Sequence, residues 1–183
     1  YGVIEGTTTV LENNRDHIEW LSEARANIKW NFWNRYKKYL EKIEHLPPSV
    51  INSIGNTTDE SLKRLESPKR EGSWDRRGMV VGNVQSGKTS NYTGLIAKAV
   101  DAQYKVIIVL AGLNNDLRSQ TQKRIDKGFI GRDTRKKDSY DQTDSKIGAG
   151  LMPGFPELPV IALTSADAGG DFKKKIHEAV TVT

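Results

Sequence analysis

The segment Gly82–Thr89 constrains the fold more than any other part of this chain. Its sequence, Gly-Asn-Val-Gln-Ser-Gly-Lys-Thr, fits the pattern Gly-x4-Gly-Lys-Ser/Thr of a phosphate-binding loop. The apolar run 79–81 comes just before it, and a pattern with apolar residues three and four positions apart follows at 87–102. A strand before the loop and a helix after it are the context that this motif requires, so pattern and context agree.

Three short apolar runs predict strands of a parallel sheet; they occupy 79–81, 105–110 and 160–163. The second and third show no alternation of polar and apolar residues, which is typical of parallel strands covered on both faces. Helical patterns at 87–102 and 115–127 separate the runs. The alternation of strand and helix therefore predicts an α/β fold, a P-loop NTPase domain over 78–183.

The first part of the chain has a different pattern. Apolar residues at helical spacing predict one long helix over 14–44, stopped by Pro47-Pro48, and Thr57 with Glu60 predicts the start of a second helix at 58–67. A charged, turn-rich segment at 68–77 then marks a domain boundary. We therefore expect a helical N-terminal region, 1–77, before the nucleotide-binding domain. Tryptophans in the first helix could stack on bases, but such spacing is more typical of packing.

The residue types of the loop explain its chemistry. Gly82 permits the turn after the strand, and Gly87 lets the backbone approach a phosphate without a Cβ in the way. Lys88 places an ammonium at the β and γ phosphates, and the Thr89 hydroxyl can ligate Mg²⁺. We expect ATP and Mg²⁺ as cofactors, Lys88 and Thr89 as the catalytic residues, and a nucleotide site formed by Gly82, Asn83, Val84, Gln85, Ser86, Gly87, Lys88, Thr89 and Ser90. A degenerate loop that binds but does not hydrolyse is the alternative.

The composition of the chain excludes some further types of site and of protein. The chain has 183 residues, no cysteine and three scattered histidines, which excludes a thiolate zinc site. No run approaches the roughly 20 apolar residues of a spanning helix, so we expect a soluble, cytoplasmic protein without membrane contact. Hydrolysis needs an acid at the end of a neighbouring strand. The candidates Asp167 and Asp171 lie in a loop beyond the run 160–163, so we expect an incomplete domain that binds ATP without turnover.

The stretch from Arg77 to Ile125 resembles the Z-one domain family, most specifically in Val-Gln-Ser-Gly-Lys-Thr at 84–89 and Leu-Arg-Ser-Gln-Thr at 117–121. Members are bacterial and phage proteins described as endonucleases, found beside restriction-modification and phage-defence genes, with a core similar to superfamily-two helicases of RecA-like fold. The resemblance implies the N-terminal fragment of a larger, DNA-acting ATPase. Its implied partners are DNA, the rest of the parent chain, and restriction or defence proteins.

In helicase-like motors the segment after the second strand grips the nucleic-acid backbone, and residues 112–120 occupy that place here. The resemblance thus implies a set of nucleic-acid contacts: Asn114, Asn115, Arg118, Ser119 and, after the third strand, Thr164. Equally open is the reading in which Asn114 caps the helix and Arg118 is a solvated charge. The charged loop 131–150 could bind phosphate, but its interleaved aspartates favour a solvated loop.

Two other functions stay open at this stage. A P-loop kinase or phosphotransferase would need an acceptor-binding lid with arginines, for which only the loop 131–150 is available. A nucleotide-gated module would use the aromatic N-terminal helices to bind a partner protein.

Overall fold

The computed structural model describes residues 16–81, 87–112, 114–135 and 145–167. Helices dominate these residues. The α-helices are α1 Leu21–Ala24, α2 Asn31–Lys42, α3 Pro48–Arg64, α4 Lys88–Asp101 and α5 Asn115–Ile125. Two 3-10 segments, Arg25–Asn27 and Gly148–Leu151, and a π-helical turn, Asp126–Ile130, complete the set. None of the helices described is long and apolar enough to cross a membrane.

The single long helix expected over 14–44 is wrong. The chain turns extended at Ile28, with ψ 125°, and this break separates α1 and its 3-10 turn from α2. The start expected at 58 is wrong too, because α3 begins at Pro48. A proline suits the first position of a helix, where its missing N–H would have had no partner. Thr57 lies inside α3 and donates its hydroxyl to the Ser53 carbonyl at 2.9 Å.

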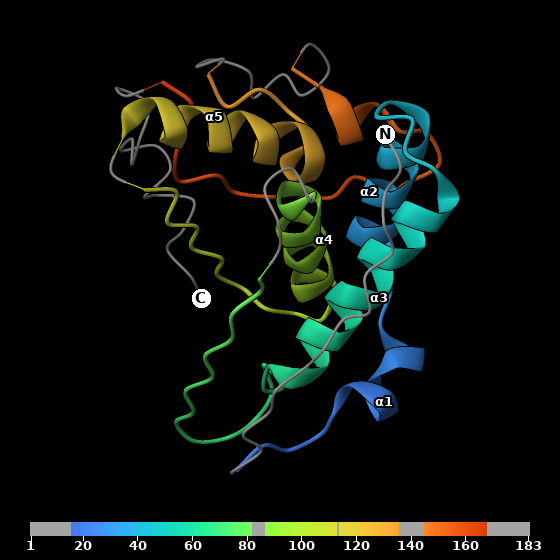
Figure 1. Ribbon diagram of the computed structural model, residues 1–183, viewed down its shortest axis with the longest axis vertical. Helices are drawn as coiled ribbons and strands as arrows, with labels where there is room; N and C mark the ends of the chain where they lie inside the picture. Colours follow the sequence, from blue (N-terminus) through green and yellow to red (C-terminus); the bar gives the residue numbers. More distant parts are fainter. Residues whose placement is uncertain (1–15, 82–86, 113, 136–144, 168–183) are drawn as a thin grey trace.

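The core lies where α4 packs against α2 and α3 (Figure 1). Two glycines make this contact close: a Cβ added at Gly55 of α3 or Gly94 of α4 would lie 3.3 or 3.2 Å from the Trp33 ring. The buried apolar residues around this contact include Tyr36, Tyr39, Leu40, Ile51, Ile54, Ile96 and Ala97. Residues on both sides of the expected boundary at 68–77 therefore share one core.

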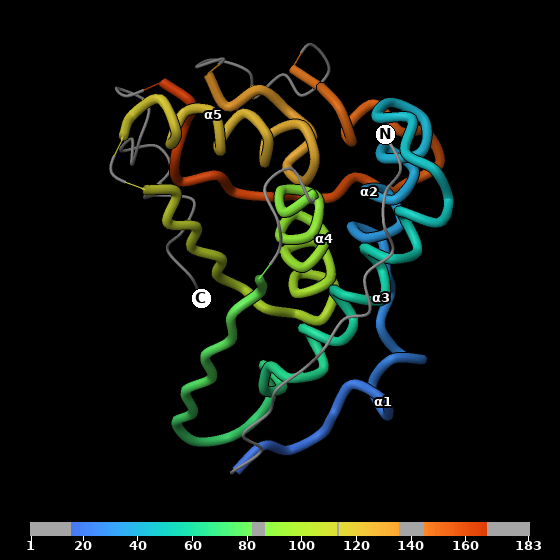
Figure 2. Tube along the Cα trace, viewed as in Figure 1, coloured from blue at the N-terminus to red at the C-terminus, as the bar shows by residue number. Residues whose placement is uncertain are grey.

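The α/β fold with a parallel sheet, and with it the RecA-like P-loop NTPase domain, is contradicted. In the described part of the chain the only strand-like pairing is one isolated antiparallel bridge, between Arg132 and Lys146. The expected strands 79–81, 105–110 and 160–163 have no regular secondary structure there and pair with no neighbouring strand. Figure 2 traces the first two as open stretches, in this view on the side of α4 opposite to α2 and α3.

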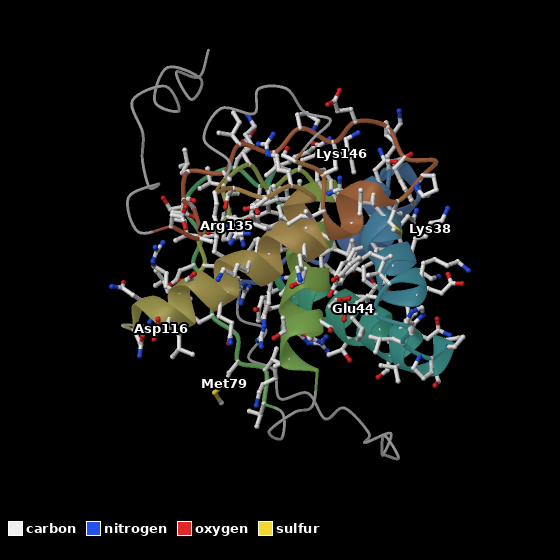
Figure 3. All side chains as sticks on the ribbon, turned by 90° about the horizontal axis from the view of Figure 1, so that it is seen from above. Lys38, Glu44, Met79, Asp116, Arg135 and Lys146 are labelled. Carbon is white, nitrogen blue, oxygen red and sulfur yellow. The ribbon has the colours of Figure 1, made fainter. Side chains whose placement is uncertain are left out.

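The exposure of these runs explains the error. From Val106 to Leu110 the exposed fractions are 72, 37, 78, 41 and 92%, and Met79 is 87% exposed, with a side chain that points away from the ribbon in Figure 3. An apolar, β-branched run predicts a strand only if a neighbouring strand accepts its backbone hydrogen bonds. The pattern contains no information on that neighbour, and helices cover α4 instead.

The helix expected at 87–102 is confirmed as α4, and the one expected at 115–127 is confirmed as α5, which passes into the π-helical turn and ends at Gly131 in left-handed conformation, φ 82°. Part of the expected loop 131–150 is ordered, because backbone bonds join Asp133 to Ser145 and Ile147 to Gly131 at 3.0 Å.

Candidate functional site

The start of α4 is the described part of the expected phosphate loop. Gly87 precedes the helix with φ 74° and ψ 22°, a left-handed conformation that glycine adopts without steric cost. Among the described residues, apart from its own chain neighbours, no heavy atom lies within 4 Å of the place where a Cβ of Gly87 would be. The first amides of α4 have no partner within the helix, and the helix dipole adds positive potential at this end. A helix start of this kind favours an anion electrostatically. Gly82, Asn83, Val84, Gln85 and Ser86 lie outside the described residues.

The two side chains for which the motif predicts a function, Lys88 and Thr89, lie in the first turn of α4. Lys88 is exposed and Thr89 is half-buried. The Thr89 Oγ1 accepts a hydrogen bond from Arg124 Nη1 at 3.1 Å, across 35 positions of sequence. Figure 1 shows how the contact arises, since the end of α5 crosses over the start of α4. A second cationic side chain therefore lies beside the hydroxyl that would ligate Mg²⁺.

A buried tyrosine supports the same turn from the other side. Tyr36 of α2 is 3% exposed and donates its hydroxyl to the Ser90 carbonyl at 3.3 Å. Burial raises the pKa of Tyr36 more than its hydrogen bonds lower it, so the hydroxyl stays a proton donor. The first turn of α4 is therefore held between α2 and α5.

Asn114 caps α5, as one of the two readings of the sequence expected. Its Oδ1 accepts from the Asp116 amide at 2.8 Å, while Asn115, the first residue of the helix, is exposed. The Asn114 side chain thus has an intramolecular role in stabilising the helix start.

The other expected nucleic-acid residues are brought together between α5 and segment 164–166. Arg118 Nη1 donates to the Ser165 carbonyl at 3.1 Å, and Ser119 Oγ donates to the Ala166 carbonyl at 2.9 Å. Thr164 Oγ1 donates to Gln122 Oε1 at 2.7 Å. The two segments thus lie side by side, as expected of a common surface, but these polar groups bind each other.

Gln122 also links this junction to a buried acid. Its Nε2 donates to Asp126 Oδ1 at 2.8 Å, and the Thr134 hydroxyl donates to the other Asp126 oxygen at 2.7 Å. Asp126 is 1% exposed, and burial raises its pKa more than the hydrogen bonds from Thr134 and Gln122 lower it. This acid is a structural anchor that fixes the end of α5, and with it the position of Arg124.

The residues available for a metal fit Mg²⁺ bound through a nucleotide. The described residues contain no group of three or more His, Asp or Glu that could hold a metal ion. Mg²⁺ is commonly held by one or two protein oxygens together with phosphates and water, and the Thr89 hydroxyl supplies such an oxygen. Of the two acids considered from the sequence, Asp167 is exposed and Asp171 lies outside the described residues.

Sequence reasoning missed Arg124 and Tyr36 as neighbours of the loop. Neither lies in the motif, and both reach it from other helices. Nothing in the periodicity of α2 or α5 indicates these contacts, because they depend on how the helices cross.

No family model, curated protein or solved structure matches this chain. The resemblance to the Z-one domain family therefore stays a prediction from the motifs, and any function has to be argued from the residues and contacts above.

Proposed function

We propose that this chain binds Mg²⁺-ATP at the start of α4, as the nucleotide-binding part of a helicase-like, DNA-acting ATPase of a restriction-modification or phage-defence system. The proposal needs only the loop and the helix that follows it, since the phosphate ligands of such a loop are backbone amides, one lysine and one hydroxyl. It makes no use of a parallel sheet.

The observation that carries the proposal is the conformation of Gly87. A left-handed glycine directly before Lys88 and Thr89, with no Cβ to keep a ligand away from its backbone, is what a backbone needs to approach a phosphate closely. Any other residue there would be strained, because L side chains rarely adopt a φ of 74°.

The side chains have distinct roles in this proposal. Lys88 would place its ammonium against the β and γ phosphates, where charge shifts during transfer. The Thr89 hydroxyl would ligate Mg²⁺, which neutralises phosphate charge when bound. Tyr36 is a positioning residue, because its hydroxyl holds the Ser90 carbonyl and so the first turn of the helix.

The DNA part of the proposal rests on charge and on the surface of α5. The chain carries a net charge of +5, and α5 exposes the polar Asn115 and the cationic Lys123. Phosphate contacts by such cations release counterions, so binding of a DNA oligonucleotide should weaken steeply with salt. Oligonucleotide affinity that does not change between low and physiological salt would contradict this part alone.

Stabilisation by nucleotide tests ATP binding. Since a ligand at 100 times its Kd stabilises the folded state by about 2.7 kcal/mol, saturating Mg²⁺-ATP should raise the free energy of unfolding measured in urea by about that amount. Lys88→Ala should reduce the gain to about 1.4 kcal/mol or less, since tenfold weaker binding leaves the ligand at only about 10 times its Kd, whereas Lys105→Ala, an exposed lysine outside the loop, should keep the full gain. Equal stabilisation of all three proteins would place the site elsewhere.

A further inference from the structure

Arg124 differs from several other arginines of this structure in the chemical type of its hydrogen-bond partner. Arg25, Arg70 and Arg76 each pair with a carboxylate, at 2.8, 2.8 and 2.5 Å. Among the described residues no carboxylate pairs with Arg124, and its one hydrogen bond goes to the uncharged Thr89 hydroxyl. An exposed guanidinium with only a neutral acceptor retains most of its capacity to bind an anion, since it has five N–H donors.

Arg124 and a bound Mg²⁺ would compete for the same oxygen atom of Thr89. The Thr89 oxygen that accepts from Arg124 is the one that would ligate Mg²⁺, at about 2.1 Å. A guanidinium nitrogen 3.1 Å from this oxygen and a divalent cation bound to it would repel each other. Binding of a Mg²⁺-nucleotide should therefore displace Arg124 from Thr89.

We propose that the displaced Arg124 binds the γ phosphate of a nucleoside triphosphate. This contact would make the site selective for triphosphates over diphosphates. The inference rests on the proposed function and deepens it. A γ phosphate offers the guanidinium two charged oxygens in its preferred fork geometry, which more than replaces one neutral hydroxyl. A diphosphate provides no such acceptor beyond its β phosphate, so the loss of the Thr89 contact is uncompensated.

The position of Arg124 is fixed well enough for this role. It lies two residues before Asp126, whose carboxylate is held by Gln122 and Thr134. The end of α5 is therefore anchored, while the Arg124 side chain itself is exposed and can reorient. Only a side-chain rotation is required to move from a hydroxyl to an adjacent phosphate.

Affinities of Mg²⁺-ATP and Mg²⁺-ADP, measured by calorimetry on the full chain, test the inference. The wild type should prefer ATP, and Arg124→Gln should lower the ratio of ATP to ADP affinity by about tenfold, the value of one charge-assisted hydrogen bond. Arg124→Lys keeps the charge but loses the fork, so it should restore part of the ratio. Lys105→Gln, which removes an exposed charge outside the loop and outside α5, should keep the wild-type ratio.

The outcomes separate this inference from the function it rests on. If the wild type binds ATP and Arg124→Gln leaves the ratio unchanged, or weakens both nucleotides equally, the role of Arg124 is overturned and ATP binding stands. If the folded wild type binds neither nucleotide, both proposals fall. Because Arg124 is exposed, the variant should unfold in urea within about 0.5 kcal/mol of the wild type, so loss of fold cannot imitate the effect.

Discussion

Lys98 Nζ lies 2.5 Å from Asp59 Oδ1 and thereby joins α4 to α3 through a charge inside the protein. Lys98 is only 2% exposed. Its ammonium also donates to the Gly55 carbonyl at 2.7 Å and lies 4.4 Å from the centroid of the Trp33 ring. Burial lowers the pKa of Lys98, while the hydrogen bond to Asp59 acts to raise it. The contact between α3 and α4 thus contains an ion pair with a buried lysine.

Lys98→Ala should lower the free energy of unfolding by about 3 kcal/mol, because it leaves Asp59 and the Gly55 carbonyl without their partner and opens a cavity. Urea denaturation measures the loss. Lys63→Ala, an exposed lysine on α3, should change stability by less than about 0.5 kcal/mol. Equal effects of the two substitutions would show that the Lys98 pair is not a structural contact.

The helices around the candidate site could be predicted where their signals are local. The bounds of α4 follow from the apolar spacing of 92–100 and from Gly87, and the start of α5 follows from the Asn114 cap. The ion pair of Lys98 could not be predicted in the same way. Its residue type suggests an exposed side chain, and only the crossing of α3 and α4 buries it.

Apart from the bounds of the N-terminal helices, sequence reasoning was wrong about the non-local part of the fold. The run 105–110 has the composition of a buried strand, yet a strand depends on a neighbour that local composition does not specify. The same limit applies to Arg124 at Thr89. A motif identifies the residues that share a segment, whereas residues brought in by another helix become visible only in the structure.

Glu66 is a second buried charge and joins three segments. It is fully buried, and its carboxylate pairs with His17 at 2.9 Å, Arg70 at 2.8 Å and Arg76 at 2.5 Å. Its own backbone carbonyl accepts from the Tyr104 hydroxyl. Burial acts to raise the pKa of Glu66, but the hydrogen bonds from His17, Arg76 and Arg70 outweigh it and lower that pKa from 4.5 to about 2.

The lowered pKa of Glu66 predicts that the stability of the folded protein depends on pH. Because the pKa is lowered in the folded state, the stabilisation is present above pH 4.5 and is lost as the pH falls toward 2. At pH 6, Glu66→Gln should cost about 2 kcal/mol of unfolding free energy. The difference between wild type and variant, followed by urea denaturation, should shrink on acidification below pH 4.5.

The matched control for that titration is Glu60→Gln, which removes an exposed i,i+4 pair with Arg64. A surface pair of this kind contributes little, so we expect less than about 0.5 kcal/mol at any pH. A difference between wild type and Glu66→Gln that stays constant down to pH 2 would contradict the role of the Glu66 charge.

A substitution at Ile108 tests whether the apolar run 106–110 is exposed in the folded protein. Ile108 is 78% exposed, within five consecutive apolar residues that carry no charge, a composition prone to edge-to-edge association. Ile108→Lys should reduce aggregation, followed by light scattering against protein concentration, and change the unfolding free energy by less than about 0.5 kcal/mol. A loss of several kcal/mol would mean that the run is buried in the folded protein, contrary to this structure.

The most direct test of the central claim is calorimetric titration of Mg²⁺-ATP into the chain and into its Lys88→Ala variant. The account predicts saturable binding of one nucleotide per chain, weakened at least about tenfold in the variant, which corresponds to about 1.4 kcal/mol. Binding that is the same in both folded proteins, or absent from the folded wild type, would contradict the assignment of a phosphate site to Gly87, Lys88 and Thr89.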